Sequence, residues 1–263
     1  MEGNTWTEAY KIVPAMPPWE GYPDYQVGYT YTHQGEVELC TSGFHASPTF
    51  VHCKQYVNPT KDCGYLKVRA HNPVWDDGVT KCVSSKLEVI SEYSYGEAQR
   101  LTQRTMINNN EYYAKGFCYH REDKDADGNA LPAVIQANGS KYWYKDGKEH
   151  REDKDADGNA LPAVIQANGS KYWYKDGELH REDKDADGNV LPAVIQAGGT
   201  KYWYKDGKLH REGKDADGNA LPAVIWADGA KEWWKDGVLQ QSPPPNKATA
   251  ASQPVGWTKE QTQ

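Results

Sequence analysis

The chain has 263 residues, about enough for two domains of ordinary size. Hydrophobic residues make up only 38%, and the aromatic ones are mostly Tyr (18) and Trp (10) rather than Phe (3). This composition excludes a thick aliphatic core and favours thin sheets that pack through polar-edged aromatic rings. The net charge of −7, from 30 basic and 37 acidic residues, argues against nucleic-acid binding through a broad basic surface.

Targeting signals are the next feature to consider. No apolar run approaches the roughly 18 residues of a membrane span, and Met1–Thr5 carry no basic-then-apolar signal pattern. We therefore expect neither a membrane partner nor classical secretion.

Residues 1–94 contain no repeat and predict a small α+β domain. Alternating apolar residues predict short strands, at residues 10–13, 27–33, 36–40, 65–70 and 87–90. Ser47 and Pro48 are typical of an N-cap and a first helical position, which predicts a helix over 48–57. A second short helix is expected over 97–106, in a linking region of residues 95–119. No Gly-rich phosphate loop, nucleophile–base pattern or paired carboxylates stand out in residues 1–94.

Five cysteines are present, an odd number without any C-x-x-C spacing: Cys40, Cys53, Cys63, Cys82 and Cys118. This pattern favours free thiols in a reducing compartment. The alternative is a zinc site that combines Cys40 and Cys53 with His45 and His52.

From His120 the sequence repeats with a period of 30 residues, giving four repeats: 120–149, 150–179, 180–209 and 210–239. The second differs from the first, HREDKDADGNALPAVIQANGSKYWYKDGKE, only in its last two residues. Residues 107–119 align with the second half of a repeat and are expected to cap the array. The predicted fold class is therefore mainly β, with a small α+β N-terminal domain followed by an antiparallel β-hairpin repeat array of the meander or solenoid type.

Each repeat contains two turn signals. Asn138-Gly139 predicts a two-residue hairpin turn, with Ala137 opposite Ser140 and Val134 opposite Trp143. Asp146-Gly147 predicts a second tight turn that returns the chain toward the next repeat. Because the repeats present the same groups along a line, the array is expected to bind or space other molecules rather than to catalyse.

An acidic segment, D-x-D-x-D-G, begins each of the first three repeats and resembles the start of a calcium loop. Position twelve, however, is Val134 rather than Glu, and the fourth repeat has Gly213 in place of its first Asp. A solvated turn is the favoured interpretation and calcium binding the alternative. The candidate ligands are Asp123, Asp125, Asp127, Asp153, Asp155, Asp157, Asp183, Asp185 and Asp187.

Two further side-chain series recur with the period. The His-Arg pairs that begin at His120, His150, His180 and His210 favour structural contacts, the imidazole beside a ring and the guanidinium beside carboxylates such as Glu122; an anion or metal ladder is the alternative. A tryptophan series favours packing across the hairpin over contact with a partner. Its members, with the lone Trp of the tail, are the candidate partner-binding residues Trp143, Trp173, Trp203, Trp233 and Trp257.

The tail, residues 240–263, is rich in Pro, Ala, Ser, Thr and Gln and is expected to be disordered on its own.

Two stretches resemble known families. Tyr25, Val27, Gly28 and Tyr31, followed by the run Gly43-Phe44-His45-Ala46, resemble the "GFHAC" pattern of an uncharacterised domain of phages, large viruses and bacteria, with Ser47 in place of the final Cys. The resemblance covers about 85 residues and implies no activity.

The repeats resemble the "HRED…G…PAVI…WY-x-NG" repeats of large viruses and phages, called MORN-like or YwqK-antitoxin-like. They differ by a longer acidic loop and lack the Y-x-G…G-x-G pattern of true MORN repeats. The two resemblances together imply a chain encoded by a virus or phage.

We therefore expect a non-enzymatic structural or protein-interaction repeat protein. Its partners would be other proteins, in a viral or phage assembly, or further copies of itself, and its location the virion or the host cytoplasm. The alternative is a soluble regulator or immunity-type protein that neutralises a partner protein. A third, least favoured hypothesis is an N-terminal enzyme that uses His45 or a thiol.

Overall fold

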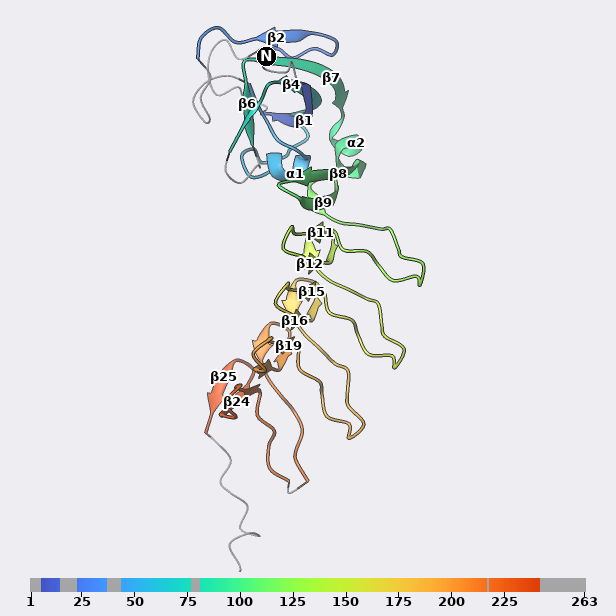
Figure 1. Ribbon diagram of the computed structural model, residues 1–263, viewed down its shortest axis with the longest axis vertical. Coiled ribbons are helices and arrows are strands. Elements are labelled where there is room, and N and C mark those ends of the chain that lie inside the picture. The colour runs from blue at the N-terminus through green and yellow to red at the C-terminus, as the bar shows by residue number, and fades with distance from the viewer. Residues whose placement is uncertain (1–5, 15–22, 37–43, 77–80, 217, 242–263) are drawn as a thin grey trace, which may run out of the picture. The chain divides into compact units, whose positions relative to one another are not determined.

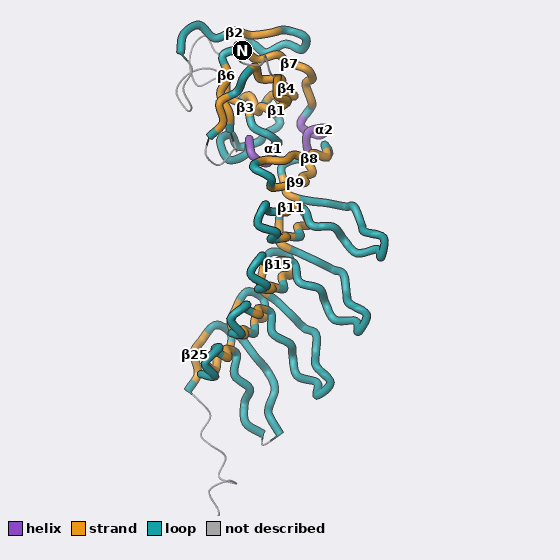
Figure 2. The backbone as a smooth tube through the Cα atoms, in the orientation of Figure 1, coloured by secondary structure: helices purple, strands orange, loops and turns teal. Residues whose placement is uncertain are grey.

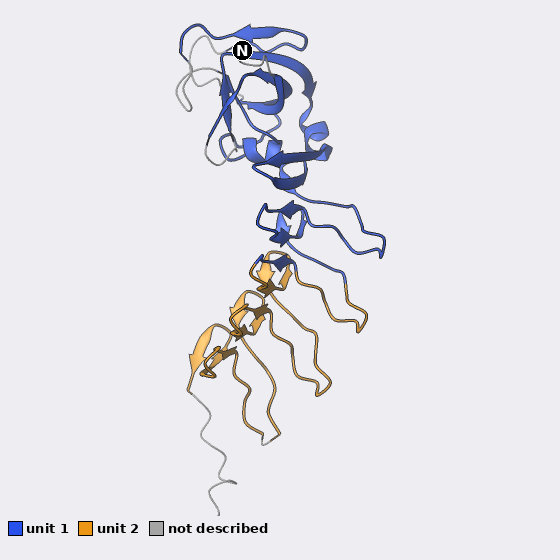
Figure 3. Cartoon of the chain, in the orientation of Figure 1, with its two compact units in different colours: residues 1–153, 163–167 blue, residues 154–162, 168–263 orange. Residues whose placement is uncertain are grey.

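The computed structural model describes residues 6–14, 23–36, 44–76, 81–216 and 218–241. The predicted fold class is confirmed: the chain is mainly β, and its described part contains two short helices (Figures 1 and 2). Neither helix is long or apolar enough to cross a membrane. The chain divides into two compact units, residues 1–153 with 163–167 and residues 154–162 with 168–263 (Figure 3).

The N-terminal part of the first unit is built on an antiparallel sheet in the order β1-β4-β7-β2. Its strands are β1 (Trp6–Val13), β4 (Gly64–His71), β7 (Lys86–Tyr93) and β2 (Thr30–Thr32). A second sheet has the order β3-β6-β5, with strands Phe44–Ala46, Cys82–Ser84 and Val74–Trp75. Alternation along β4 buries Leu66, Val68 and Ala70 in one apolar cluster with Phe44 and Leu87.

Strands 65–70 and 87–90 are each found, slightly extended at both ends, and strands 10–13 and 27–33 are found with shifted bounds. The strand expected at 36–40 falls almost entirely outside the described residues. Strands β3, β5 and β6 have only two or three residues each and were not predicted, because such short segments carry too little alternation to be detected.

The two predicted helices are shorter than expected. Helix α1 covers Phe50–Cys53, and its N-cap is Thr49 rather than Ser47, because Thr49 Oγ1 accepts the His52 N–H whereas Ser47 pairs through its backbone with Tyr10. Helix α2 covers Tyr95–Arg100 and begins with a capping box formed by Ser94 and Glu97. The residues after it do not continue the helix, because the β-branched segment from Thr102 onward pairs as a strand.

The linking region pairs with the first repeat. Strand β8 (Thr102–Ile107) pairs with β9 (Asn110–Lys115), which also pairs with β10 (Cys118–Tyr119) and with the first repeat. The Tyr113 N–H donates to the Ala133 carbonyl, as Trp143 N–H does to that of Ala163 one period later. Residues 107–119 therefore act as the predicted half repeat.

In each of the first three repeats, two short strands join the large sheet and two more form a separate two-stranded sheet, and a long acidic loop extends from the repeat (Figure 2). In the first compact unit the strands are β11 (Val134–Ile135), β12 (Lys141–Tyr142), β13 (Tyr144–Lys145), β14 (Lys148–Glu149) and β15 (Val164–Ile165). In the second they are β16 (Lys171–Tyr172), β17 (Tyr174–Lys175), β18 (Glu178–Leu179), β19 (Val194–Ile195), β20 (Lys201–Tyr202), β21 (Tyr204–Lys205), β22 (Lys208–Leu209), β23 (Val224–Ile225), β24 (Lys231–Lys235) and β25 (Val238–Gln240).

The predicted hairpin register is wrong by one residue. Val134 lies opposite Tyr142, and Gln136 N–H donates to the Ser140 carbonyl, so the loop has three residues rather than two. Gly139 adopts φ +92°, which only glycine adopts readily. The loop thus combines a turn with a left-handed glycine, the second common hairpin geometry. The Asp146-Gly147 turn is the predicted two-residue turn, with positive φ at both residues and Lys145 opposite Lys148.

Candidate functional site

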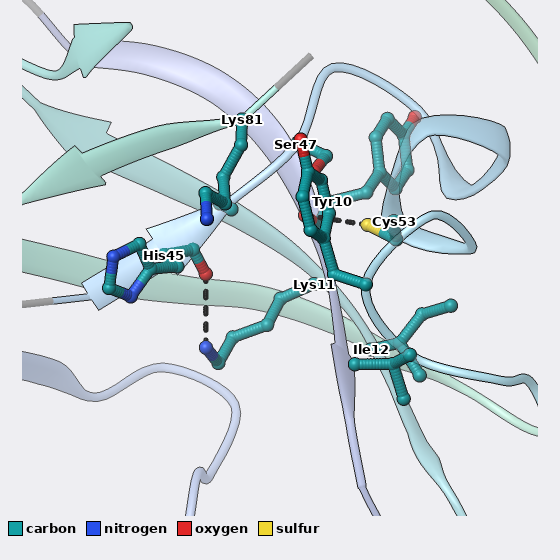
Figure 4. A pocket seen from close by; sticks show the side chains of 10 residues that line it. Tyr10, Lys11, Ile12, His45, Ser47, Cys53 and Lys81 are labelled. Atoms are coloured by element: carbon teal, nitrogen blue, oxygen red, sulfur yellow. Dashed lines mark hydrogen bonds between the residues drawn. The ribbon is translucent and has the colours of Figure 1, made fainter. Parts of the chain in front are cut away.

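The N-terminal domain contains a small pocket of about 70 Å³ between β1, β3 and α1 (Figure 4). Lys11 is 7% exposed and its Nζ donates to the His45 carbonyl oxygen at 3.0 Å. Burial lowers the pKa of Lys11 to about 8. The ammonium also lies 5.3 Å from the Tyr25 ring centroid. These contacts tie β1 to β3.

The thiols of this region are poor nucleophiles. Cys53 Sγ donates to the Tyr10 carbonyl oxygen at 3.2 Å, and burial raises the pKa of Cys53 to about 12. Burial likewise raises the pKa of Cys82 to about 12. Because the thiolate is the reactive form, neither thiol fits the third hypothesis. Cys53, Cys63, Cys82 and Cys118 are free, and Cys40 lies outside the described residues.

His52 is 2% exposed, and its Nδ1 lies 2.8 Å from Thr49 Oγ1. Its ring packs in a T-shaped arrangement against Tyr112 and Tyr119, with ring centroids 5.4 and 6.2 Å apart. Burial lowers the pKa of His52 to about 4, so the imidazole is neutral at pH 7. In the described part of the chain no three His, Cys, Asp or Glu side chains are placed to hold a metal ion.

The repeats place the same set of contacts at every period. The guanidinium carbon of each repeat's arginine lies 3.6 to 4.1 Å from the centroid of an aromatic ring. The pairs are Arg121 with Tyr113, Arg151 with Trp143, Arg181 with Trp173 and Arg211 with Trp203. Structural use of the arginines was predicted, but the ring partner was assigned to the histidine instead.

In the first three repeats the acidic partner of the arginine is the Asp two residues later, not a Glu122-type residue. In the second repeat Arg151 Nε donates to Asp153 Oδ2 at 2.8 Å. The same oxygen accepts the Ala130 N–H from the loop of the first repeat at 2.9 Å. In the third repeat Asp183 Oδ2 accepts from Arg181 Nε and from the Ala160 N–H. This carboxylate therefore links an arginine to the preceding acidic loop.

The histidines make the contacts expected of the arginines. His180 Nδ1 and His210 Nδ1 accept the backbone N–H groups of Asp206 and Asp236 at 3.1 Å. The other ring nitrogen, Nε2, lies within 3.3 Å of the glutamate two residues later in all four repeats. These contacts join each histidine to the glutamate that follows it, and join His180 and His210 also to the Asp-Gly turn of the same repeat.

The acidic loops are held by their own side chains. Asp125 Oδ1 accepts the N–H groups of Asp127 and Asn129 at 3.0 and 2.9 Å, and Asp155 and Asp185 repeat this arrangement. Asp123 is engaged by Arg121. The first two carboxylates of the first three loops thus serve the backbone and the arginine, which favours the solvated-turn interpretation. Calcium binding stays the alternative interpretation.

The tryptophans of the first three repeats are packed inside the array. Trp143, Trp173 and Trp203 are 4% to 6% exposed, and each indole Nε1–H donates to a loop carbonyl at 2.7 Å. Trp233, the equivalent residue of the last repeat, is half-buried, and Trp257 lies outside the described residues. The geometry favours the packing interpretation for the three buried rings.

A serine or threonine ladder was not predicted. Ser140 Oγ accepts the Ala167 N–H, Ser170 Oγ accepts the Ala197 N–H, and Thr200 Oγ1 accepts the Ala227 N–H. The last repeat, which no repeat follows, has Ala230 at this position. That loss of a hydroxyl at the end of the array was the signal in the sequence that could have revealed the ladder.

Part of the chain is similar to a known domain family. Residues 8–101 match a domain of unknown function (DUF7666). No curated protein and no solved structure matches the chain.

Proposed function

We propose that this chain is a non-enzymatic structural or protein-interaction protein of a viral or phage assembly. One observation carries the proposal: the repeats present the same exposed charges at a fixed interval. The sheet strands expose Lys141, Lys171 and Lys201, and the loops expose the acidic residues around Asp125, Asp155 and Asp185. A regular series of lysines and acidic loops suits a partner that is itself extended or repetitive.

The distribution of polar groups supports the absence of catalysis. In the array the arginines, histidines and first aspartates contact one another or the backbone in each repeat. In the N-terminal pocket, Lys11 and Cys53 are engaged with backbone carbonyls. A catalytic centre needs unlike groups that converge on one reacting atom. The described residues instead use their polar groups to hold loops and strands together.

A quantitative mass-spectrometric census of purified particles tests the proposal. We expect the chain to be a component of the particle, in a fixed ratio of several copies to its major protein. A protein that is absent from particles but co-purifies with one soluble partner would support the regulator or immunity-type alternative and overturn the assembly role.

A further inference from the structure

The fourth repeat breaks the arginine–aspartate pattern at one position. Gly213 stands where Asp123, Asp153 and Asp183 stand in the other repeats. In the second and third repeats that aspartate accepts two donors, the Nε–H of its own arginine and one loop N–H of the preceding repeat. The loss of the carboxylate therefore affects two donors at once, Arg211 Nε and the Val190 N–H.

Arg211 keeps the pose of the other arginines without the acidic partner. Its guanidinium lies 3.8 Å from the Trp203 ring centroid, and its Nη1 donates to the Pro222 carbonyl at 3.1 Å, as Arg181 Nη1 does to that of Pro192 at 3.2 Å. Its Nε is buried and has no acceptor among the described residues. Burial lowers the pKa of Arg211 to about 10, with only Asp185 opposing the shift.

The second donor also keeps its place. Trp203 Nε1 donates to the Val190 carbonyl at 2.7 Å, as Trp173 Nε1 does to that of Ala160. The Val190 peptide is thus fixed like the Ala160 peptide, whose N–H donates to Asp183 at 3.0 Å. No oxygen of the described residues accepts the Val190 N–H.

Both donors belong to residues that line one groove of about 180 Å³ between the third and fourth repeats. Four basic side chains (Arg181, Lys184, Lys205 and Arg211) and two acidic ones (Glu182 and Glu212) line it, together with His180 and His210. A carboxylate group is small enough for this volume, and a buried guanidinium nitrogen without an acceptor strongly favours an anionic oxygen.

We propose that this groove binds a carboxylate from outside the chain, which takes the position that the missing aspartate side chain would occupy. One oxygen of the ligand accepts from Arg211 Nε and from the Val190 N–H. The site stands without the proposed function. That the carboxylate belongs to an acidic side chain of a protein partner rests on the proposed function.

The test follows the amide of Val190 and the Nε–H of Arg211 by 15N-correlated NMR during titration with sodium acetate. We expect saturable shifts of both signals at one site per chain, and no such shifts with sodium chloride at equal ionic strength. Absence of a saturable acetate shift in the folded protein would overturn the site.

Two variants sharpen the test. Gly213→Asp supplies an internal carboxylate and should abolish the acetate shifts. Gly213 has φ +118°, but Asp123, Asp153 and Asp183 have no positive φ, so the substituted backbone can adopt the conformation of the other repeats. An added Cβ would meet only the side-chain ends of Leu221 at 3.1 Å and Asn189 at 3.5 Å.

In the third repeat, Asp183→Gly should create a second acetate site at Arg181 and the Ala160 N–H. If Gly213→Asp stays folded and leaves the shifts intact, or if folded Asp183→Gly gains none, the assignment is wrong.

The source of the carboxylate is tested separately. A blocked tripeptide with one glutamate should reproduce the acetate shifts, and its glutamine counterpart should not. If acetate binds but the glutamate peptide does not, the partner assignment fails and the site remains one for small free carboxylates. The particle census does not depend on either titration. A failure of the proposed function is therefore distinguished from a failure of the carboxylate site.

Discussion

At the scale of the residue, the burial of His52 makes the stability of the folded protein depend on pH. The unfolded imidazole takes up a proton near its ordinary pKa of 6.5, whereas the folded one does so only near 4. Between these values the unfolded state binds more protons, so stability falls as the pH drops from about 6.5 toward 4. Above 6.5 this contribution is complete and constant.

We expect His52, which stays neutral in the folded protein, to lower the free energy of unfolding by up to about 3 kcal/mol over that pH interval. Urea unfolding at a series of pH values, compared between the wild type and His52→Gln, measures it. The glutamine variant keeps a polar partner for Thr49 but cannot titrate, so its curve should be flatter by this amount. Equal slopes in the two proteins would refute the role of His52.

The serine ladder permits a second residue-scale prediction with a built-in control. Ser170 is 3% exposed and accepts the Ala197 N–H at 3.0 Å. Ser170→Ala leaves that amide without its acceptor and should lower the free energy of unfolding by about 1–2 kcal/mol. Ala230→Ser, at the equivalent position of the last repeat, should change it by less than about 0.5 kcal/mol. Chemical denaturation of the two variants checks this; similar effects would show that the ladder is not stabilising.

At the scale of the element, the acidic loop is held by hydrogen bonds between its own side chains and its own backbone. Asp125 Oδ1 already accepts two N–H groups and Asp123 Oδ2 is held by Arg121, so a cation that used these oxygens would have to compete with the existing contacts. We therefore expect calorimetric titration with calcium at millimolar concentration to give no heat above dilution. Heat that saturates at three ions per chain would instead support calcium loops in the first three repeats.

The same scale shows what the sequence could and could not predict. The period, the cap and the Asp146-Gly147 turn were predictable, because identical residues recur at fixed spacing and the turn chemistry is specific. The Asn138-Gly139 register was not, because an Asn-Gly pair fits a two-residue turn as well as the three-residue loop observed. The Asp153 contact with the Ala130 N–H was also hidden, since it joins residues 23 positions apart in the chain.

The candidate sites were predictable to a similar extent. Sequence reasoning singled out the His-Arg pairs, the aspartates and the tryptophans, and the structure brings arginine, first aspartate and aromatic ring together in each compact unit. It assigned the wrong member of each pair to the ring, because adjacent residues point to different sides and spacing alone does not say which faces inward. The Arg211 groove needed the structure, since the loss of one aspartate matters only where its two donors remain in place.

At the scale of the whole molecule, the array should tolerate the loss of a complete period but not of half a period. Removing residues 150–179 joins Glu149 to His180, so that Glu149 is again followed by the first histidine of a repeat, as it is by His150 in the intact chain. Each remaining strand still meets a neighbour of the same type, so the variant should fold cooperatively. Removing residues 150–164 instead brings unlike halves together and leaves buried tryptophan and arginine positions without their partners.

Circular dichroism and thermal melting of the two deletion variants measure this difference. We expect the 30-residue deletion to keep the β spectrum and a single transition, with a midpoint within several degrees of the wild type, because an array of this kind is stabilised mainly by contacts between neighbouring repeats. The 15-residue deletion should aggregate or lose the transition of the repeats. If both variants melt alike, the period of 30 residues is not the unit of folding.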